Sequence, residues 1–419
     1  MKGRIPLTGQ ILIALAAGTA AGLIIGKPVG VLGDVGKLVI QAIKVAATPL
    51  LMLDVINAVL QAKVSAKSGL RMVVLASVNA SIALGFGLAL SNALKPGRHM
   101  AGNFSSVSWT SATAPAPVVK QKIGPMAVLS GFVPTSLVSP FAENSVIPLV
   151  GMALLLSLAL RKLKESGTDT HGLERDFEIL QKAMETILGW IIRLVPVAVF
   201  AVVAKAVGEQ GFAPFRGLAA YVGVGLLGLT LHPLITYTLW LTGYARMDLR
   251  RFFEAAREPV IYAAGANSSL ATLPITLKAL DKLGVSKGAS ALGACVGTNL
   301  NNDGIILYEA MAVLFVAQAH GIELTLAQQM FAAGSCLLAA MGIAGVPEAG
   351  FISLSLVLTT VGLPLEILPL LLTVDWVLAR ARSVVNVLSD MMISILLDRW
   401  DGARFDKRAP AFSAEPEAA

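Results

Sequence analysis

The stretch AAGANSSLATLP, residues 263–274, is a polar run of small residues between two apolar helical segments that together span residues 249–284. A second such run, AMGIAGVPEAG at residues 340–350, interrupts the apolar segment of residues 326–363. Backbone that stops being helical at bilayer depth must be buried in protein or face a water-filled cavity. We therefore predict two re-entrant helical hairpins, each with its polar tip at mid-membrane. The alternative, a surface loop between short amphipathic helices, is disfavoured by the apolar arms and the low charge of the tips.

The composition of the whole chain is that of a membrane protein. Of its 419 residues, 55% are hydrophobic and 14% are charged, whereas soluble domains have about a quarter of charged residues. We expect a long external connection at residues 95–143 and a charged cytoplasmic loop at residues 161–182. The fold class is thus an all-α polytopic membrane protein with eight transmembrane helices and two re-entrant helical hairpins. The eight predicted spans are residues 9–27, 36–61, 70–94, 144–163, 184–206, 214–242, 288–319 and 364–398.

The formal net charge of +7 is distributed as in a membrane protein and not as in a nucleic-acid-binding patch. Basic residues occupy alternate loops, which marks those loops and both termini as cytoplasmic. The localisation that we expect is the plasma membrane (a bacterial inner membrane), with a multi-pass topology. No phosphate-binding loop, metal motif or disulfide framework is visible, so no cofactor is expected. The basic residues are Lys2, Arg4, Lys63, Lys67, Arg71, Arg161, Lys162, Lys164, Arg246, Arg250, Arg251, Arg257, Arg399, Arg404, Lys407 and Arg408.

Within the span 288–319 lies the polar run GTNLNNDG, residues 297–304. Asn299, Asn301, Asn302 and Asp303 cannot face lipid, and next to glycine they can unwind the helix. They then offer carbonyl, amide and carboxylate oxygens, the ligands that hard cations such as Na⁺ prefer. A polar cluster that only packs helices together is the alternative.

The last span carries a polar face. Asp375, Arg382, Ser383, Asn386 and Asp390 occupy a stripe roughly 100° wide at ~100° per residue. The planar fork of the Arg382 guanidinium suits a carboxylate. This stripe is therefore a candidate site for an anionic solute, with a self-neutralising salt-bridge face as the alternative.

Glu309 lies in an apolar helix six residues after Asp303. A buried carboxyl favours its neutral form, so Glu309 is a candidate proton carrier. Arg380 lies off the polar stripe and could close one wall of the cavity. A permanent Glu309–Arg380 pair is the alternative interpretation.

Residues 250–392 resemble the dicarboxylate/amino acid:cation symporter family. Residues 268–274 resemble the first hairpin tip of that family, and residues 342–347 the second. Residues 301–304 resemble its Asn-Met-Asp-Gly break, and residues 375–390 its last helix. The N-terminal half matches more loosely, around residues 44–49 and 145–158.

The resemblance implies a homotrimer whose transport domain moves against a scaffold as an elevator. It places residues 1–248 mainly in scaffold and trimerisation helices, with the third and sixth spans joining the transport domain. Residues 249–398 then form the transport core, and residues 399–419 a cytoplasmic tail.

The resemblance also implies residue roles. Two Na⁺ sites are matched, one by Gly297, Asn301, Asn386 and Asp390 and the other partly by Asn301 and Asp303. Arg382 matches the arginine that binds the distal carboxylate of the solute, and the second tip matches a gate over solute and cation. Glu309 matches a carboxyl that carries a proton in animal members. Candidate solute-contacting residues are Ser268, Ser269, Val346, Gly350, Ala379, Arg382, Ser383 and Asn386, with Asn299, Asn302 and Arg380 as secondary candidates.

Departures from the family pattern bear on the solute. Ala379 stands where amino-acid carriers of the family have an aspartate for the ammonium group of the solute. C4-dicarboxylate carriers of the family also lack this aspartate. Ile305, Asn302, Asn79 and Ala80 also depart from the usual residues of the cation and solute sites. We expect Na⁺-coupled symport, with H⁺ as a candidate second ion, of an acidic solute, with a C4-dicarboxylate favoured. The alternatives are an aspartate or glutamate symporter and an uncoupled anion pathway; a membrane hydrolase lacks a nucleophile–base pair.

Overall fold

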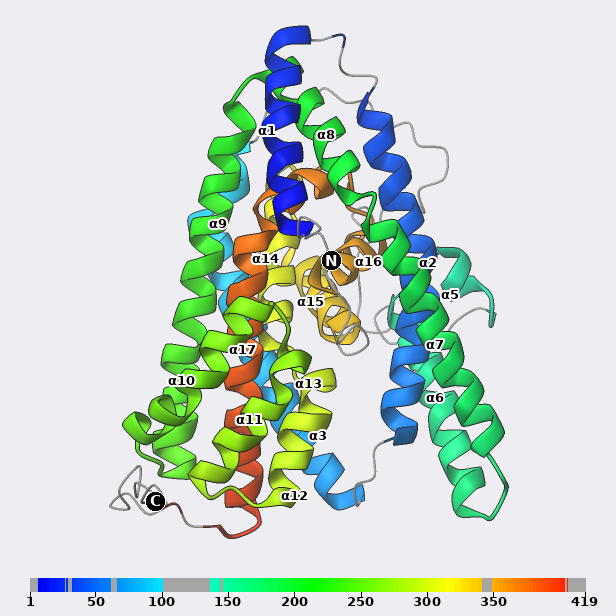
Figure 1. Ribbon diagram of the computed structural model, residues 1–419, viewed down its shortest axis with the longest axis vertical. Helices are drawn as coiled ribbons and strands as arrows, with labels where there is room; N and C mark the ends of the chain where they lie inside the picture. Colours follow the sequence, from blue (N-terminus) through cyan, green and yellow to red (C-terminus); the bar gives the residue numbers. More distant parts are fainter. Residues whose placement is uncertain are drawn as a thin grey trace, which may run out of the picture.

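The computed structural model describes residues 7–26, 28, 32–61, 66–100, 136–143, 146–340, 349–403 and 405. This part of the chain is helical and contains no strand, as predicted (Figure 1). The helices are α1 (Leu7–Ile25), α2 (Gly33–Gln61), α3 (Ala66–Leu94), η2 (Pro96–Met100), α5 (Ser139–Glu143), α6 (Val146–Glu165), α7 (His171–Ile192), α8 (Val195–Gln210), α9 (Ala213–His232), η4 (Pro233–Tyr237), η5 (Trp240–Ala245), α10 (Leu249–Ala266), α11 (Ser269–Leu283), α12 (Lys287–Ser290), η6 (Ala291–Val296), α13 (Gly297–Leu300), α14 (Asp303–Ala319), α15 (Leu326–Ala340), α16 (Ala349–Thr360) and α17 (Leu368–Trp400).

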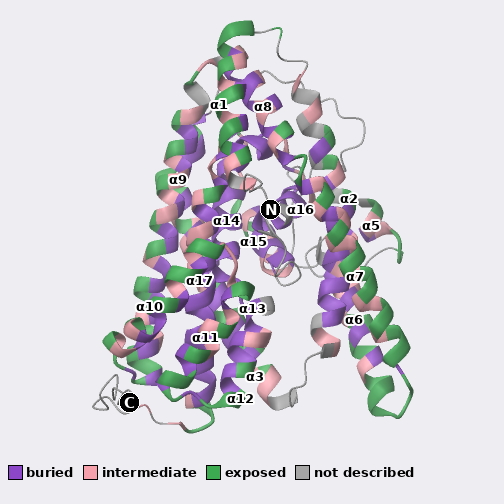
Figure 2. Cartoon of the chain, in the orientation of Figure 1, coloured by how far each residue is buried: buried purple, intermediate pink, exposed green. Residues whose placement is uncertain are grey.

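The outer surface of the molecule is apolar, and many polar side chains lie inside it. Within the described ranges, three helical stretches are long and apolar enough to cross a membrane: Ser68–Leu94, His171–Glu209 and Phe215–Ala245. Less than half of the most apolar window of each is buried. Large apolar side chains such as Ile24, Leu155 and Leu239 are exposed. Figure 2 shows that exposed positions recur along the outer helices. Apolar surface of this extent, around a core that contains charges, is expected of a protein whose solvent is lipid.

One sequence prediction about the first half of the chain is wrong. The predicted loop at residues 161–182 is mostly helical, since α6 continues to Glu165 and α7 already begins at His171. Leu188 of α7 is part of the apolar core, and Phe177 packs against it. The predicted span at residues 184–206 lies within His171–Glu209, which is long and apolar enough to cross a membrane. A short turn at residues 193–194 separates α7 from α8, next to Pro196, which has no N–H to continue the hydrogen-bond ladder.

The helices pack in two groups around the C-terminal half. In one group α1 runs along α8, and α2 contacts α6, α7 and α8 (Figure 1). In the other, α3 and α9 pack directly against α14 and α17. The third and sixth predicted spans therefore supply walls to the core in which the polar residues lie.

The first predicted hairpin is a pair of packed helices, α10 and α11. The chain reverses at Asn267, whose φ of 52° is left-handed, a conformation that asparagine tolerates better than most residues. Ser268 then caps α11 by accepting a hydrogen bond from the backbone N–H of Ala271. In the second predicted hairpin α15 packs against α16, but the tip at residues 341–348, which includes Val346, lies outside the described residues.

The predicted unwinding of the span 288–319 is confirmed. Helix α13 ends at Leu300, Asn301 and Asn302 have non-helical backbone angles, and α14 begins at Asp303. Two π-helical segments, η4 and η6, also lie in the core. Such segments are rare and are often found at functional sites. By contrast, α17 is one uninterrupted helix of 33 residues.

Candidate functional site

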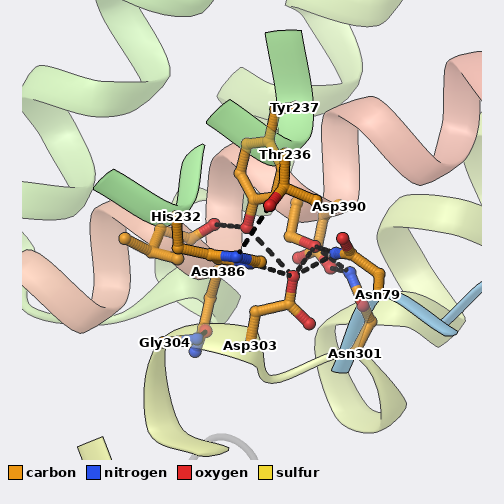
Figure 3. A network of polar contacts seen from close by, with 11 residues as sticks. Asn79, His232, Thr236, Tyr237, Asn301, Asp303, Gly304, Asn386 and Asp390 are labelled. Atoms are coloured by element: carbon orange, nitrogen blue, oxygen red, sulfur yellow. Dashed lines mark hydrogen bonds and ion pairs between the residues drawn. The ribbon is translucent and has the colours of Figure 1, made fainter. Parts of the chain in front are cut away.

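A network of hydrogen bonds centres on the fully buried carboxylate of Asp303, at the N-terminus of α14. Its Oδ2 accepts from the Ser389 hydroxyl at 2.8 Å and from the Tyr237 hydroxyl at 3.0 Å. The Asn79 amide also donates to Oδ2, and the Nε2 atom of His232 lies 3.3 Å away (Figure 3). Residues of α3, α9, η4 and α17 thus converge on one carboxylate oxygen. Their hydrogen bonds connect the start of α14 to α3, to the continuous segment α9–η4 and to α17.

The ring of His232 is oriented from both sides. Its Nδ1 lies 3.2 Å from the Thr236 hydroxyl, one turn further along the same helix. The tautomer that donates from Nε2 to Asp303 accepts at Nδ1 from the Thr236 hydroxyl. The arrangement resembles the outer shell of an ion site, where a second hydrogen bond sets the orientation of a first.

Other oxygen atoms of the same network have no hydrogen-bond partner. Among the described residues, the atoms of this network without a partner are Asn79 Oδ1, Asn301 Oδ1 and Asp303 Oδ1, on three fully buried side chains. An unpaired buried polar atom is costly, typically by about 1–3 kcal/mol, so each such atom calls for an explanation. Amide and carboxylate oxygens are ligands of hard cations. The residues present therefore fit Na⁺.

Asp390 belongs to the same cluster. Its Oδ1 accepts a hydrogen bond of 3.3 Å from the Asn301 amide, which also donates to Ser389 at 2.8 Å. Gly297 lies directly against it, since a Cβ atom on Gly297 would stand 3.2 Å from Asp390 Oδ1. The structure thus brings together Gly297, Asn301, Asp303 and Asp390, as the cation-site hypothesis requires.

Asn386 connects this cluster to the rest of the core. Its Oδ1 accepts from the backbone N–H of Gly304 at 2.8 Å, and its amide donates to Asn302 Oδ1 at 3.2 Å. Asn302 in turn donates to the carbonyl oxygen of Ala340, the last residue of α15. A Cβ on Gly304 would lie 2.6 Å from the Arg382 carbonyl oxygen, so only glycine allows this approach of α14 to α17. One chain of contacts therefore joins the helix break, the last helix and the second hairpin.

Arg382 is buried and held on three sides. Its Nη1 and Nη2 donate to the two carboxylate oxygens of Asp375 at 2.6 and 3.0 Å. Its guanidinium carbon lies 4.0 Å from the centre of the Tyr308 ring. A Cβ on Gly350 would stand 3.0–3.2 Å from the guanidinium atoms. The salt bridge that was the alternative interpretation does form, but it neutralises only Asp375, since Asp390 is bonded to Asn301.

Glu309 and Arg380 do not pair. Arg380 donates to the carbonyl oxygen of Trp376 at 2.7 Å, and its guanidinium lies over the Trp376 ring. Glu309 is fully buried beside Cys336 and Ser353, and neither of its carboxyl oxygens has a partner at hydrogen-bond geometry among the described residues. The permanent Glu309–Arg380 pair is therefore wrong for this conformation, and Arg380 lies apart from the cluster.

The tip of the first hairpin reaches the last helix. The Ser383 hydroxyl donates to Asn267 Oδ1 at 3.3 Å, and the half-buried Ser268 and Ser269 are the next two residues of the tip. Ala379, one turn before Ser383 on α17, is buried. The side chain of Asn299 and all of Val346 lie outside the described part of the chain.

Six residues of the site were not predicted from the sequence: His232, Thr236, Tyr237, Asn267, Tyr308 and Ser389. A histidine in an otherwise apolar helix is a signal in itself, because ionisable residues within a membrane are rarely without function. Ser389 adjoins Asp390 and extends the polar stripe of α17. Tyr237 carries no comparable signal, since tyrosine is common in membrane helices.

Replacing Gly350 with alanine tests the packing around Arg382. The new methyl group would press on a guanidinium that Asp375 and Tyr308 already hold, so either Arg382 or α16 must shift. We expect solute affinity to fall about tenfold, the equivalent of one hydrogen bond to a charged group. Isothermal titration with the solute would measure this, and Gly334→Ala, where the added Cβ meets nothing, is the control. Equal affinities of the two variants would contradict the prediction.

Comparison with known proteins gives consistent matches over almost the whole chain. The model of the sodium:dicarboxylate symporter family matches residues 7–400. A C4-dicarboxylate transport protein 3 of Ralstonia nicotianae is 29% identical, over 98% of this chain and 93% of the relative. A C4-dicarboxylate transport protein of Laribacter hongkongensis is 28% identical, over 94% and 89%. A proton/sodium-glutamate symport protein of Bacillus subtilis is 25% identical, over 94% and 93%.

Proposed function

Because this chain belongs to the sodium:dicarboxylate symporter family, we propose that it couples Na⁺ entry to the uptake of an acidic organic solute, with a C4-dicarboxylate favoured. It is a cation-coupled transporter and not an enzyme. The observation that carries the proposal is the set of buried, unpartnered oxygens on Asn79, Asn301 and Asp303. With Asp390 and the carbonyl of Gly297, these atoms would hold Na⁺, which supplies positive charge to the core.

The charges of the core explain why cation and solute would be coupled. Asp303, Asp375 and Asp390 are buried carboxylates, and Arg382 is the one buried guanidinium beside them among the described residues. A buried charge without a counter-charge costs several kcal/mol. An anionic solute therefore enters the core favourably only once cations have offset the aspartates. Each ligand then raises the affinity for the other, as coupling requires.

The chemistry of the solute site favours a dicarboxylate over an amino acid. Arg382 is oriented by Asp375 and Tyr308 for a carboxylate. Ala379 supplies no negative charge for an α-ammonium group, and Asp375 already serves Arg382. The first two relatives named above are C4-dicarboxylate transport proteins, which supports the same ranking. An aspartate or glutamate symporter is the second candidate, supported by the glutamate symport relative.

Glu309 is the proposed site of a second coupling ion, H⁺. Its carboxyl is fully buried, its oxygens have no partner at hydrogen-bond geometry among the described residues, and it lies close to Arg382. A buried carboxyl of this kind can bind a proton and carry it across the membrane when the transport core moves with its solute.

The proposal extends to the assembly and the membrane. It includes eight spans with two re-entrant hairpins, a homotrimer, elevator motion of residues 249–398 against a scaffold, and insertion in a bacterial inner membrane with cytoplasmic termini. The start of α3, the α6–α7 and α9–α10 connections and the end of α17 lie at one end of the molecule (Figure 1). Since these segments carry most of the basic residues, that end is the proposed cytoplasmic end.

Uptake by proteoliposomes tests the function. The purified protein should accumulate radiolabelled succinate from a Na⁺ medium, and replacement of Na⁺ by choline should abolish the accumulation. L-Aspartate should be taken up at least tenfold less efficiently than succinate, because its ammonium group meets no acid at Ala379. Uptake that stops at equilibrium with either cation would indicate an uncoupled anion pathway. Aspartate exceeding succinate would reverse the ranking of the solutes.

A further inference from the structure

The tip of the first hairpin places an amide side chain next to the polar stripe of α17. Asn267 ends α10, and its Oδ1 lies 3.3 Å from the Ser383 hydroxyl. Ser383 follows Arg382 directly and lies one turn after Ala379. Asn267 is therefore the hairpin residue that contacts α17 where the proposed solute would lie.

The hydrogen bond from Ser383 engages only the oxygen of the Asn267 side-chain amide. The Oδ1 atom accepts from the hydroxyl, and the Nδ2 atom makes no hydrogen bond to the described residues. The side chain is only half-buried, so the described residues do not enclose it. An amide whose oxygen is engaged presents donors to its surroundings, and donors suit a carboxylate and repel an ammonium group.

The neighbourhood of Asn267 is consistent with an anion and not with a cation. Ala379 leaves this turn of α17 without an acidic side chain, and Asp375 faces Arg382 through both of its carboxylate oxygens. The solute that Arg382 binds at one end must find donors for a second carboxylate at its other end. Asn267 can supply such a donor from the tip of the first hairpin.

We propose that Asn267 is a specificity-determining residue whose amide N–H binds the second carboxylate of a dicarboxylate and disfavours an amino group there. The contact from Ser383 sets the direction of this amide, so Ser383 is a positioning residue. This inference rests on the proposed function, because it presupposes an acidic solute held by Arg382. The preference for a dicarboxylate would then have two sources: the donor of Asn267 on the hairpin, and the absence of an acidic side chain at Ala379.

Two replacements of Asn267 separate this role from a structural one. Glycine removes the side chain and aspartate replaces the donor by an acceptor, and both tolerate the left-handed backbone at this position. In saturating Na⁺, Asn267→Gly should bind succinate about tenfold more weakly, since one hydrogen bond to a charged group is lost. Asn267→Asp should weaken succinate binding about 100-fold and L-aspartate binding far less, so that the preference between them narrows or reverses.

Controls distinguish the outcomes. Na⁺ binding without solute, followed by thermal shift, should be unchanged in both variants. The control Asn92→Asp adds the same charge at an exposed amide that pairs with Gln329 at the far end of α3, and it should bind both solutes as the wild type does. Unchanged succinate binding by both Asn267 variants, or equal weakening of both solutes together with Na⁺, would overturn the inference while the function stands. A wild-type protein that binds neither solute would instead refute the proposed function, and this inference with it.

Discussion

Substitution of Arg382 by lysine is expected to lower Na⁺-driven succinate uptake at least about 100-fold, even though the positive charge remains. The guanidinium donates two parallel hydrogen bonds to Asp375 and stacks on Tyr308. A lysine ammonium is a compact point charge that can reproduce neither the fork nor the stack. A partly unpaired Asp375 would add a penalty, because breaking a buried ion pair costs about 3–5 kcal/mol. Initial rates in proteoliposomes would measure the effect.

A neighbouring arginine provides the matched control. Arg380 lies on the same helix, but its side chain is half-exposed and turned to Trp376. Arg380→Lys should therefore retain uptake within about twofold, as is usual for surface changes away from a site. A result in which both lysine variants transport equally well would show that Arg382 does not bind the solute. Retained Na⁺ binding by Arg382→Lys would confirm that the core is folded.

Substitution of Asp303 by asparagine should remove most of the Na⁺ dependence of the protein. Four side chains, those of Asn79, His232, Tyr237 and Ser389, surround its Oδ2, so an asparagine would keep its oxygen at that position. Its NH₂ group would then replace Oδ1, which turns an unpartnered cation ligand into a donor. With the charge lost as well, Na⁺ affinity should fall by at least about 100-fold, more than 2.7 kcal/mol.

Thermal shift at increasing Na⁺ concentration reads out this loss, because a ligand that binds the native state raises its stability by mass action. Asp281→Asn makes the same change at an exposed position near the end of α11, and its Na⁺ response should match the wild type. Na⁺ stabilisation of Asp303→Asn equal to that of the wild type would show that the cation binds elsewhere.

The pattern of the chain predicted the elements around the site because local chemistry determines them. The helix is interrupted at Asn301 and Asn302, a residue type that is disfavoured in helix interiors. The polar residues of α17 share a face because the helical repeat is regular, and all five are buried. The hairpin reversal at Asn267 and Ser268 follows from their turn and capping preferences.

Predictions were wrong where the outcome depended on what a segment packs against. The charges of residues 161–182 suggested a loop, but the apolar face of α7 is covered by α2, so the segment is helical. Glu309 and Arg380 are both polar residues of apolar helices, yet the geometry of α17 turns Arg380 outward to Trp376. Residues far apart in the sequence interact only when packing makes them neighbours.

Hydropathy and local backbone preference act over a few residues, so the sequence alone predicts an all-helical membrane protein, a chain reversal at Asn267, a helix break at Asn301 and a polar stripe on the last helix. The hydrogen-bond partners of these residues became known only from the packing of the helices. Arg382 pairs with Asp375, four side chains surround Oδ2 of Asp303, and Ser383 donates to Asn267. The physical reason is that a buried polar atom must find its partner within about 3 Å. Which atom arrives there depends on how distant helices pack.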